Sequence, residues 1–299
     1  MSFTVLNPGL HSLLVDEGRP GARHLGIPVG GPADAESYSL GNWLAGNESN
    51  AVALEISFAG PTLRAESAMG AVIVGAPFAA EIVGKRSLEP GVGFNLEPGD
   101  MLKISGTPVG VRAYLCVPGG IDVPEIMGSR SSFGPISEGQ SFACRPSNIA
   151  PVAVGYTPLP LPVILRVLPG PQNDWFLNPA EFTDGDYTVQ PASNRMGIRL
   201  VGKSLTRRIG ELPSEPVAPG AVQVTNDGQP VILGVDGQTI GGYPKVAHII
   251  RADLDRLGQL RPGDLVRFHF VNTNEAKAAV AERAKRLSEW KVRIEARKK

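Results

Sequence analysis

The chain carries one plan of segments twice, in the same order and at nearly constant spacing, and this repeat limits its fold more than any other feature. The four matched pairs are LEPGDMLKI at 96–104 with LRPGDLVRF at 260–268, AVIVGAPFAAEIVG at 71–84 with PVILGVDGQTIGGY at 230–243, EISFAG at 55–60 with EPVAPG at 215–220, and HLGI at 24–27 with RMGI at 195–198. Self-similarity that keeps its order over this length indicates a tandem duplication of one domain.

The repeat sets the expected domain boundaries. We predict a first domain over residues 1–155, a second over 160–273 and a separate helix over 274–299. The seam APVAVGYTPLPLP, residues 150–162, holds four prolines and is typical of a stiff linker.

Short runs rich in β-branched and aromatic residues, separated by glycine and proline, predict a mainly β fold with few helices. The predicted strands are 71–84, 101–105, 111–117, 163–168, 230–235 and 265–271. Helices are expected over 33–46, with Asp34 as its N-cap, and over 275–299. The segment GIRLVGKS at 197–204 matches the letters of a phosphate-binding loop, but its Ile, Leu and Val predict a strand instead.

The C-terminal helix is predicted to be basic and amphipathic. From Glu275 to Lys299 it has nine basic and four acidic residues, a net charge of about +5. Val280, Leu287 and Ile294 fall at heptad spacing, with Ala284 and Trp290 near them. This stripe would pack either on the protein's own domain or on a partner.

Charge and composition exclude several classes of function. Lys plus Arg and Asp plus Glu are both 29, which argues against nucleic-acid or membrane-surface binding through bulk electrostatics. No apolar run reaches the length of a membrane span, and the first residues lack the pattern of a signal peptide. The two cysteines and four scattered histidines predict no metal site. A cytoplasmic location with free, buried thiols is expected.

Two polar concentrations are the candidate sites. The first is DGQTIGGYPK at 236–245, where Asp236, Gln238 and Thr239 follow an apolar strand, although the matching segment of the first copy reads APFAAEI. The repeated scaffold therefore does not need them, so either a ligand site at the mouth of a barrel or an ordinary polar turn is expected. The second is VDEGRPGARHLGIPVGGPAD, residues 15–34, in which Arg19 between glycines can present a planar cation to an anionic group, or can simply be solvated.

Several segments resemble, in order, the carboxyltransferase-like family. They are NPGLHSLLVDEGRPG, GNWLAGN, GSRSS, LRVLPGPQ, NRMGIRLVG, GAVQV, GQPVILGVDGQTIGGYPK and QLRPGD. The resemblance covers nearly all of residues 3–272. That family includes the C-type component of bacterial 5-oxoprolinase, the antagonist of the kinase-A inhibitor, the second subunit of allophanate hydrolase and the carboxyltransferase region of urea carboxylase.

The resemblance implies two tandem cyclophilin-like β-barrels and a heteromeric enzyme. It implies a B-type partner subunit, an A-type subunit in the oxoprolinase case, and a small amide as substrate. ATP would be used by the complex, at a site outside this chain, and biotin would be carried by a separate protein if it is used. The implied catalytic residues are Asp16, Arg19, Asp236, Gln238 and Lys245, and the implied substrate-binding residues are Asp34, Arg195, Gln223, Thr239, Gly241, Gly242 and Tyr243.

The implied roles follow residue chemistry. Arg19 and Lys245 would hold a carboxylate or a carbonyl-derived anion, and Asp16, Asp236 and Gln238 would position the amide or a water. The chain departs from the family where Val15 replaces the usual glutamine and where FGPISEGQSFACRPSN follows GSRSS. Three hypotheses stay open: a subunit of a 5-oxoprolinase-type ATP-dependent amidohydrolase, a non-catalytic protein that sequesters a kinase-inhibitor-like partner, and a carboxyltransferase that uses a separate biotin carrier.

Overall fold

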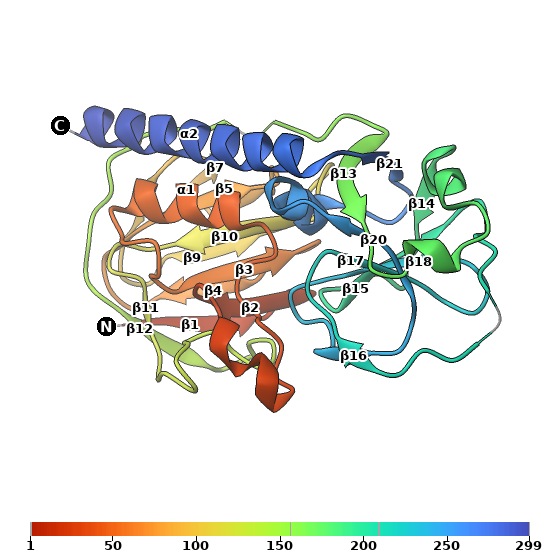
Figure 1. Ribbon diagram of the computed structural model, residues 1–299. Helices are drawn as coiled ribbons and strands as arrows, with labels where there is room; N and C mark the ends of the chain where they lie inside the picture. Colours follow the sequence, from red (N-terminus) through yellow and green to blue (C-terminus); the bar gives the residue numbers. More distant parts are fainter. Residues whose placement is uncertain (1, 156, 209, 299) are drawn as a thin grey trace. The chain divides into compact units, whose positions relative to one another are not determined.

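The computed structural model describes residues 2–155, 157–208 and 210–298 (Figure 1). It divides the chain into two compact units. The first unit comprises residues up to Gly18, Asp34–Pro158 and the residues from Arg286 onward, and the second comprises Arg19–Ala33 and Leu159–Lys285. In this division residues 19–33 belong to the second unit, and the C-terminal helix is divided between the two. The domain boundaries near residues 155 and 273 stay predictions.

The first unit is built from two sheets and one helix. Its strands are β1 (Ser2–Asn7), β2 (His11–Val15), β3 (Ala53–Ser57), β4 (Thr62–Ala65), β5 (Met69–Gly75), β6 (Ala80–Ile82), β7 (Arg86–Leu88), β8 (Phe94–Leu96), β9 (Met101–Ile104), β10 (Arg112–Cys116), β11 (Ile121–Asp122) and β12 (Ser141–Cys144). A seven-stranded sheet has the order β11-β12-β1-β4-β9-β6-β7, and a five-stranded sheet has the order β2-β3-β10-β5-β8. Apolar side chains of both sheets, such as Phe3, Leu54 and Leu102, form one core.

Helix α1 (Ala35–Ala45) packs on β5 and β10 of the five-stranded sheet (Figure 1). Asp34 is its N-cap, as predicted, because its carboxylate accepts hydrogen bonds from the backbone N–H of Ser37 at 3.0 Å and from the Ser37 hydroxyl at 2.6 Å. Gly46 ends the helix in the left-handed conformation that glycine adopts readily.

The second unit contains a closed barrel. Its strands are β13 (Val163–Pro169), β14 (Tyr187–Val189), β15 (Gly197–Val201), β17 (Ala221–Val224), β18 (Pro230–Leu233), β20 (Lys245–Ile249) and β21 (Leu265–Phe270), in the order β13-β20-β17-β18-β15-β14-β21. A small ribbon pairs β16 (Glu215–Pro216) with β19 (Ile240–Gly241). Four short 3-10 helices are described: η1 (Pro20–Leu25), η2 (Asn173–Trp175), η3 (Pro179–Thr183) and η4 (Arg251–Gln259).

The expected mainly β fold with few helices is confirmed, and the phosphate-loop-like letters of 197–204 begin with strand β15, as predicted. Closure into a barrel is seen in the second unit, whereas the strands of the first unit form two separate sheets. A barrel removes the unpaired sheet edges by pairing its first and last strands, here β13 and β21, in parallel.

Helix α2 (Thr273–Lys298) packs through part of the predicted stripe, Trp290 and Ile294, and through residues outside it. Ala276 and Ala279 pack against Ile250 in the second unit, and Trp290 and Ile294 pack in the apolar cluster of the first. Val280 is exposed, as is Ala284, so the expectation that these two lie on the packed face was wrong. The packed residues follow the 3.6-residue period of an α-helix, from which a heptad repeat drifts by about 20° per seven residues. No helix among the described residues is long and apolar enough to cross a membrane.

Candidate functional site

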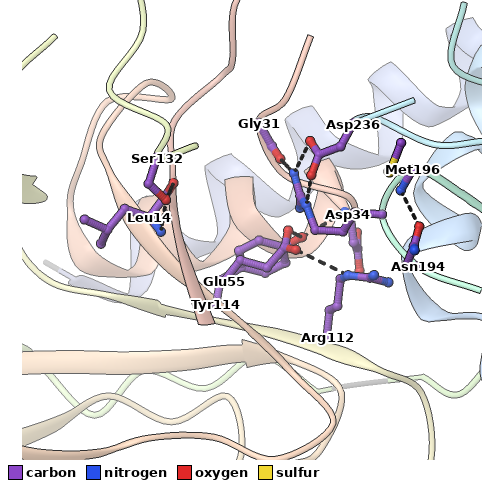
Figure 2. Close-up of polar contacts among 11 residues, drawn as sticks. Leu14, Gly31, Asp34, Glu55, Arg112, Tyr114, Ser132, Asn194, Met196 and Asp236 are labelled. Carbon is purple, nitrogen blue, oxygen red and sulfur yellow. Dashed lines mark hydrogen bonds and ion pairs between the residues drawn. The ribbon is translucent and has the colours of Figure 1, made fainter. Parts of the chain in front are cut away.

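Arg195 and Asp236 form a two-point ion pair at the end of strand β18. The Arg195 Nε lies 2.6 Å from Asp236 Oδ2, and its Nη2 lies 2.9 Å from Oδ1 (Figure 2). The same Nη2 donates to the carbonyl oxygen of Gly31 at 2.8 Å. Because a guanidinium is planar and rigid, this pairing fixes Arg195, which is buried, and orients the partly exposed carboxylate of Asp236.

The segment 19–33 is therefore joined to the loop after β18, within the second unit. The backbone N–H of Gly30 donates to the carbonyl oxygen of Val235 at 3.0 Å. A side-chain carbon at Gly30 would lie 3.9 Å from Arg19 Nη1 and 4.0 Å from Asp236 Oδ1, so both side chains border the space beside this glycine. Gly30 and Gly31 both have positive φ, a conformation that glycine adopts without cost.

A second polar cluster surrounds Lys245 at the start of strand β20. Its ammonium group forms an ion pair with Glu215 Oε1, and the carboxamide of Gln172 donates to the same oxygen at 2.8 Å. The Gln172 side chain also accepts from the backbone N–H of Lys245 at 3.2 Å. The ion pair with Lys245, followed by the bond from Gln172, lowers the pKa of Glu215 below its ordinary value.

Gln223 lies beside this cluster. It is paired in register with Lys245 on the neighbouring strand, so the two side chains share one face of the barrel wall. Gly241 lies against the Gln223 carboxamide, and the predicted residues Thr239 and Gly241 are buried, whereas Gln238 and Tyr243 are exposed. Gly242 is half-buried, and a side-chain carbon there would lie 3.1 Å from the carbonyl oxygen of Leu212.

Asp16 belongs to the first unit, and its carboxylate is held by the segment GSRSS. It accepts hydrogen bonds from the Ser129 hydroxyl, the Ser131 hydroxyl at 2.7 Å, the backbone N–H of Arg130 at 2.6 Å and that of Gly18 at 2.9 Å. Burial alone would raise the pKa of Asp16, but these donors outweigh it and lower the pKa below the ordinary value. Such a carboxylate organises its turn and stays charged.

Asp34, also in the first unit, is tied to a buried network. Its backbone N–H donates to the Tyr114 hydroxyl at 2.8 Å, and that hydroxyl donates to Glu55 Oε2 at 2.8 Å (Figure 2). Glu55 Oε1 lies 3.3 Å from Arg112 Nε. Burial, followed by the nearby Glu55 and Asp34 charges, raises the pKa of Tyr114, which remains a neutral hydroxyl.

The structure groups the predicted residues in three places. Arg19, Arg195 and Asp236 form one cluster, Gln223, Gln238, Gly241 and Lys245 form another, and Asp16 and Asp34 lie in the first unit. Sequence reasoning missed Glu215 and Gln172, although both carried a signal: Glu215 begins the repeated segment EPVAPG, and Gln172 ends the motif LRVLPGPQ. Among the described residues, no group of three or more His, Cys, Asp or Glu is placed to hold a metal ion.

Comparison with known proteins identifies the class. Residues 25–270 match the model of the carboxyltransferase domain, subdomains A and B, and the chain belongs to this family. It is 32% identical to the C-type component of 5-oxoprolinase from Haemophilus influenzae, over 91% of this chain and 92% of that protein.

Solved structures agree with this assignment. The crystal structure of TTHA0988 is 36% identical, with a TM-score of 0.81 over 90% of this chain, and the chain spans 56% of its length. The crystal structure of K. lactis urea amidolyase is 28% identical, with a TM-score of 0.85 over 97% of this chain and 20% of that chain. The same fold is thus also found within longer proteins.

Proposed function

We propose that the chain is the carboxyltransferase-like subunit of an ATP-dependent enzyme complex that opens a cyclic amide, of the 5-oxoprolinase type. The observation that carries the proposal is the similarity to the C-type component of 5-oxoprolinase, which extends over 92% of that protein. A relative named as one component of an enzyme implies partners, so a B-type and an A-type subunit are expected in the complex. ATP is assigned to the complex and not to this chain, and a cytoplasmic location stays a prediction.

The two clusters of the second unit support a site for a small amide. Arg19 and Lys245 supply cations at buried positions, and Asp236, held by Arg195, supplies a partly exposed carboxylate. Gln223 and Gln238 supply carboxamide donors, and both lie against Gly241. Fixed charges and dipoles of this kind stabilise charge that develops on an amide carbonyl during attack.

We assign Asp16 and Asp34, both in the first unit, to positioning their own segments. Asp16 has its acceptor capacity taken by the segment 128–132, and Asp34 caps helix α1. Thr239 would contribute through its backbone, whose carbonyl oxygen accepts a hydrogen bond from the N–H of Val217 at 2.9 Å. Tyr243 would contribute an exposed aromatic face.

The proposal is tested by reconstitution. The chain is co-expressed with a B-type and an A-type protein, and glutamate formation from 5-oxoproline is measured with and without ATP, and with this chain omitted. We expect turnover only in the complete mixture. Arg19→Ala and Lys245→Ala should each lower kcat/KM at least tenfold, while Gly185→Ala, at a site with open space around it, should act as the wild type. Full activity of both cation variants would remove the anion-binding role.

A second candidate is favoured by the match to K. lactis urea amidolyase, which covers 97% of this chain. In this case the chain would transfer a carboxyl group from biotin on a separate carrier to urea or a related amide. Carboxylation of urea in the presence of a biotinylated carrier, without glutamate formation, would select it.

A further inference from the structure

Residues 19–29 of the second unit form an Ω-loop, a compact surface loop whose two ends lie together. The backbone N–H of Arg19 donates to the carbonyl oxygen of Val29 at 2.6 Å and closes the neck of the loop. Within the loop, the N–H of Ala22 donates to the carbonyl oxygen of Arg19 at 3.1 Å and starts helix η1. These eleven residues are called the lid below, and they have an internal structure of their own.

The body of the lid is packed weakly. Of the six residues of η1, Ala22 is the buried one, and Leu25 is 58% exposed. A side-chain carbon at Gly21 or Gly26 would meet no described heavy atom within 4 Å. A segment with so few buried apolar contacts opens at a lower free-energy cost than the core of its unit.

Hydrogen bonds through Gly30 and Gly31, which follow the lid, join its base to the barrel. The N–H of Gly30 donates to the carbonyl oxygen of Val235 at 3.0 Å, and the carbonyl oxygen of Gly31 accepts from Arg195 Nη2 at 2.8 Å (Figure 2). Gly30 has a φ of 65°, and a side-chain carbon there would meet nothing closer than 3.9 Å. The position therefore needs glycine for its backbone conformation and not for close packing, as a hinge does.

Arg195 belongs to the fixed side of this contact. Its carbonyl oxygen accepts from the backbone N–H of Asp236 at 3.1 Å, and its guanidinium binds both carboxylate oxygens of Asp236, at 2.6 Å and 2.9 Å. The Arg195 side chain is 7% exposed. Because the backbone and the planar fork of Arg195 are both held by Asp236, Arg195 stays with the barrel, and its Nη2 reaches the base of the lid.

Arg19 is the charged group that the lid carries at its neck. Its Nη1 lies 3.9 Å from the place of a side-chain carbon at Gly30, and Asp236 Oδ1 lies 4.0 Å from the same place. Movement of the lid about its base would take this cation away from the space that Asp236 borders, or return it there.

From these contacts we infer that the lid opens and closes about Gly30 and Gly31, that Arg195 latches it shut through the Gly31 carbonyl, and that closure brings Arg19 to the candidate site. Arg195 is then a latch, in place of the substrate-binding role that the family resemblance implies. Asp236 has both oxygens engaged by the latch and orients it. The inference rests on the proposed function for the ligand, a small anion that Arg19 would hold, and not for the latch itself.

The first test is hydrogen exchange of the full-length chain, followed by mass spectrometry of its peptides. Arg195→Lys keeps the charge, but one ammonium group cannot bind Asp236 and Gly31 in the geometry of the planar fork. We expect Arg195→Lys to speed exchange in the lid at least tenfold more than in strand β17, which reports opening of the barrel as a whole. An equal factor in the two segments, or no change in the lid, overturns the latch.

Arg166→Lys is the matched control. Arg166 binds Asp253 with the same two-point geometry, at 3.0 Å and 2.6 Å, in the same unit, and Asp253 lies in η4. Loss of this pair should speed exchange in the lid and in β17 by the same factor. A lid-selective effect of Arg166→Lys would mean that the lid responds to any loss of stability, and would overturn the assignment of Arg195.

Limited proteolysis gives a second readout. Trypsin does not cut the bond between Arg19 and Pro20, because proline follows the arginine, so the tryptic site of the lid is the bond after Arg23, beside the exposed His24 and Leu25. Cleavage there should be at least tenfold faster in Arg195→Lys than in the wild type, and Arg23→Gln should abolish it. The same rate in Arg195→Lys and the wild type would contradict the latch.

Ligands test whether closure depends on Arg19. L-5-oxoproline, which has a carboxylate, should slow exchange in the lid at least threefold in the wild type and leave it unchanged in Arg19→Ala. The probe 2-pyrrolidinone, the same ring without the carboxylate, should not slow it. Equal protection by the two compounds would remove Arg19 from the closure.

This inference and the proposed function fail in different ways. If the proposed function is wrong, the complex forms no glutamate and L-5-oxoproline does not protect the lid, while Arg195→Lys still releases it. If the latch is wrong, the complex forms glutamate, and Arg195→Lys changes exchange in the lid and in β17 alike.

Discussion

At the scale of single residues, Asp16 is a buried carboxylate with four donors, and its charge should stabilise the first unit. Asp16→Asn replaces an acceptor by an N–H donor that faces other donors, and we expect it to lower the free energy of unfolding by about 2–4 kcal/mol. Since the folded pKa lies below the ordinary 3.8, the contribution is present above about pH 4 and is lost as the pH falls through the folded pKa. Urea unfolding of the wild type and of Asp16→Asn between pH 3 and pH 7 measures the difference in their free energies of unfolding. A difference that does not become smaller at low pH would contradict the prediction.

Arg195 and Asp236 should act as a coupled pair. Arg195→Lys loses the two-point contact and the bond to Gly31, and Asp236→Asn loses the charge, so each should destabilise the second unit. In a double-mutant cycle we expect a coupling energy of about 1–2 kcal/mol, because Arg195 is buried and Asp236 only partly so. The pair Lys203 and Glu181, in which the lysine is exposed and the carboxylate half-buried, provides the control cycle, with coupling near zero. Additive effects of the Arg195 and Asp236 changes would argue against the pairing.

At the scale of elements, helix α2 depends on a few buried side chains at 3.6-residue spacing. Ile294 is 2% exposed in the apolar cluster of the first unit, and Val292, two residues away, is 62% exposed. Ile294→Ala should cost about 2–4 kcal/mol of unfolding free energy, and Val292→Ala less than about 0.5 kcal/mol. Chemical denaturation of the two variants measures the loss of unfolding free energy in each. Equal effects would mean that the end of the helix does not depend on this packing.

At the scale of the whole molecule, the two units exchange segments. Residues 19–33 leave the first unit to join the second, and the residues from Arg286 onward join the first. When the chain is cut after Pro158 and the halves are expressed together, we expect them to co-purify, because each half carries a segment that packs with the other half's unit. Deletion of residues 19–33 from one half together with residues 286–299 from the other should abolish the association. Independent, monomeric halves would contradict this prediction.

How far the sequence predicts the structure depends on the range of the interaction. Strands β5, β9, β10, β13, β18 and β21 and helix α1 follow from local signals: alternation, β-branched residues, glycine and proline at the ends, and Asp34 as a cap. The segments that resemble the family also predict functional roles for Arg195, Asp236, Gln223 and Lys245. These are properties that a short window of residues carries.

The sequence alone therefore determined the mainly β class, the repeated plan and the set of candidate site residues. Only the tertiary structure decided that residues 19–33 pack with the second unit, that Arg195 clamps Asp236 across 41 positions, and that Glu215 meets Lys245. It also decided that the helix buries Ala276 and Ala279 in place of Val280. The physical reason is that a local pattern indicates which segments form strands or helices, whereas the face that an element buries and the pairing of distant polar groups depend on packing, sheet register and chain closure, which no local window contains.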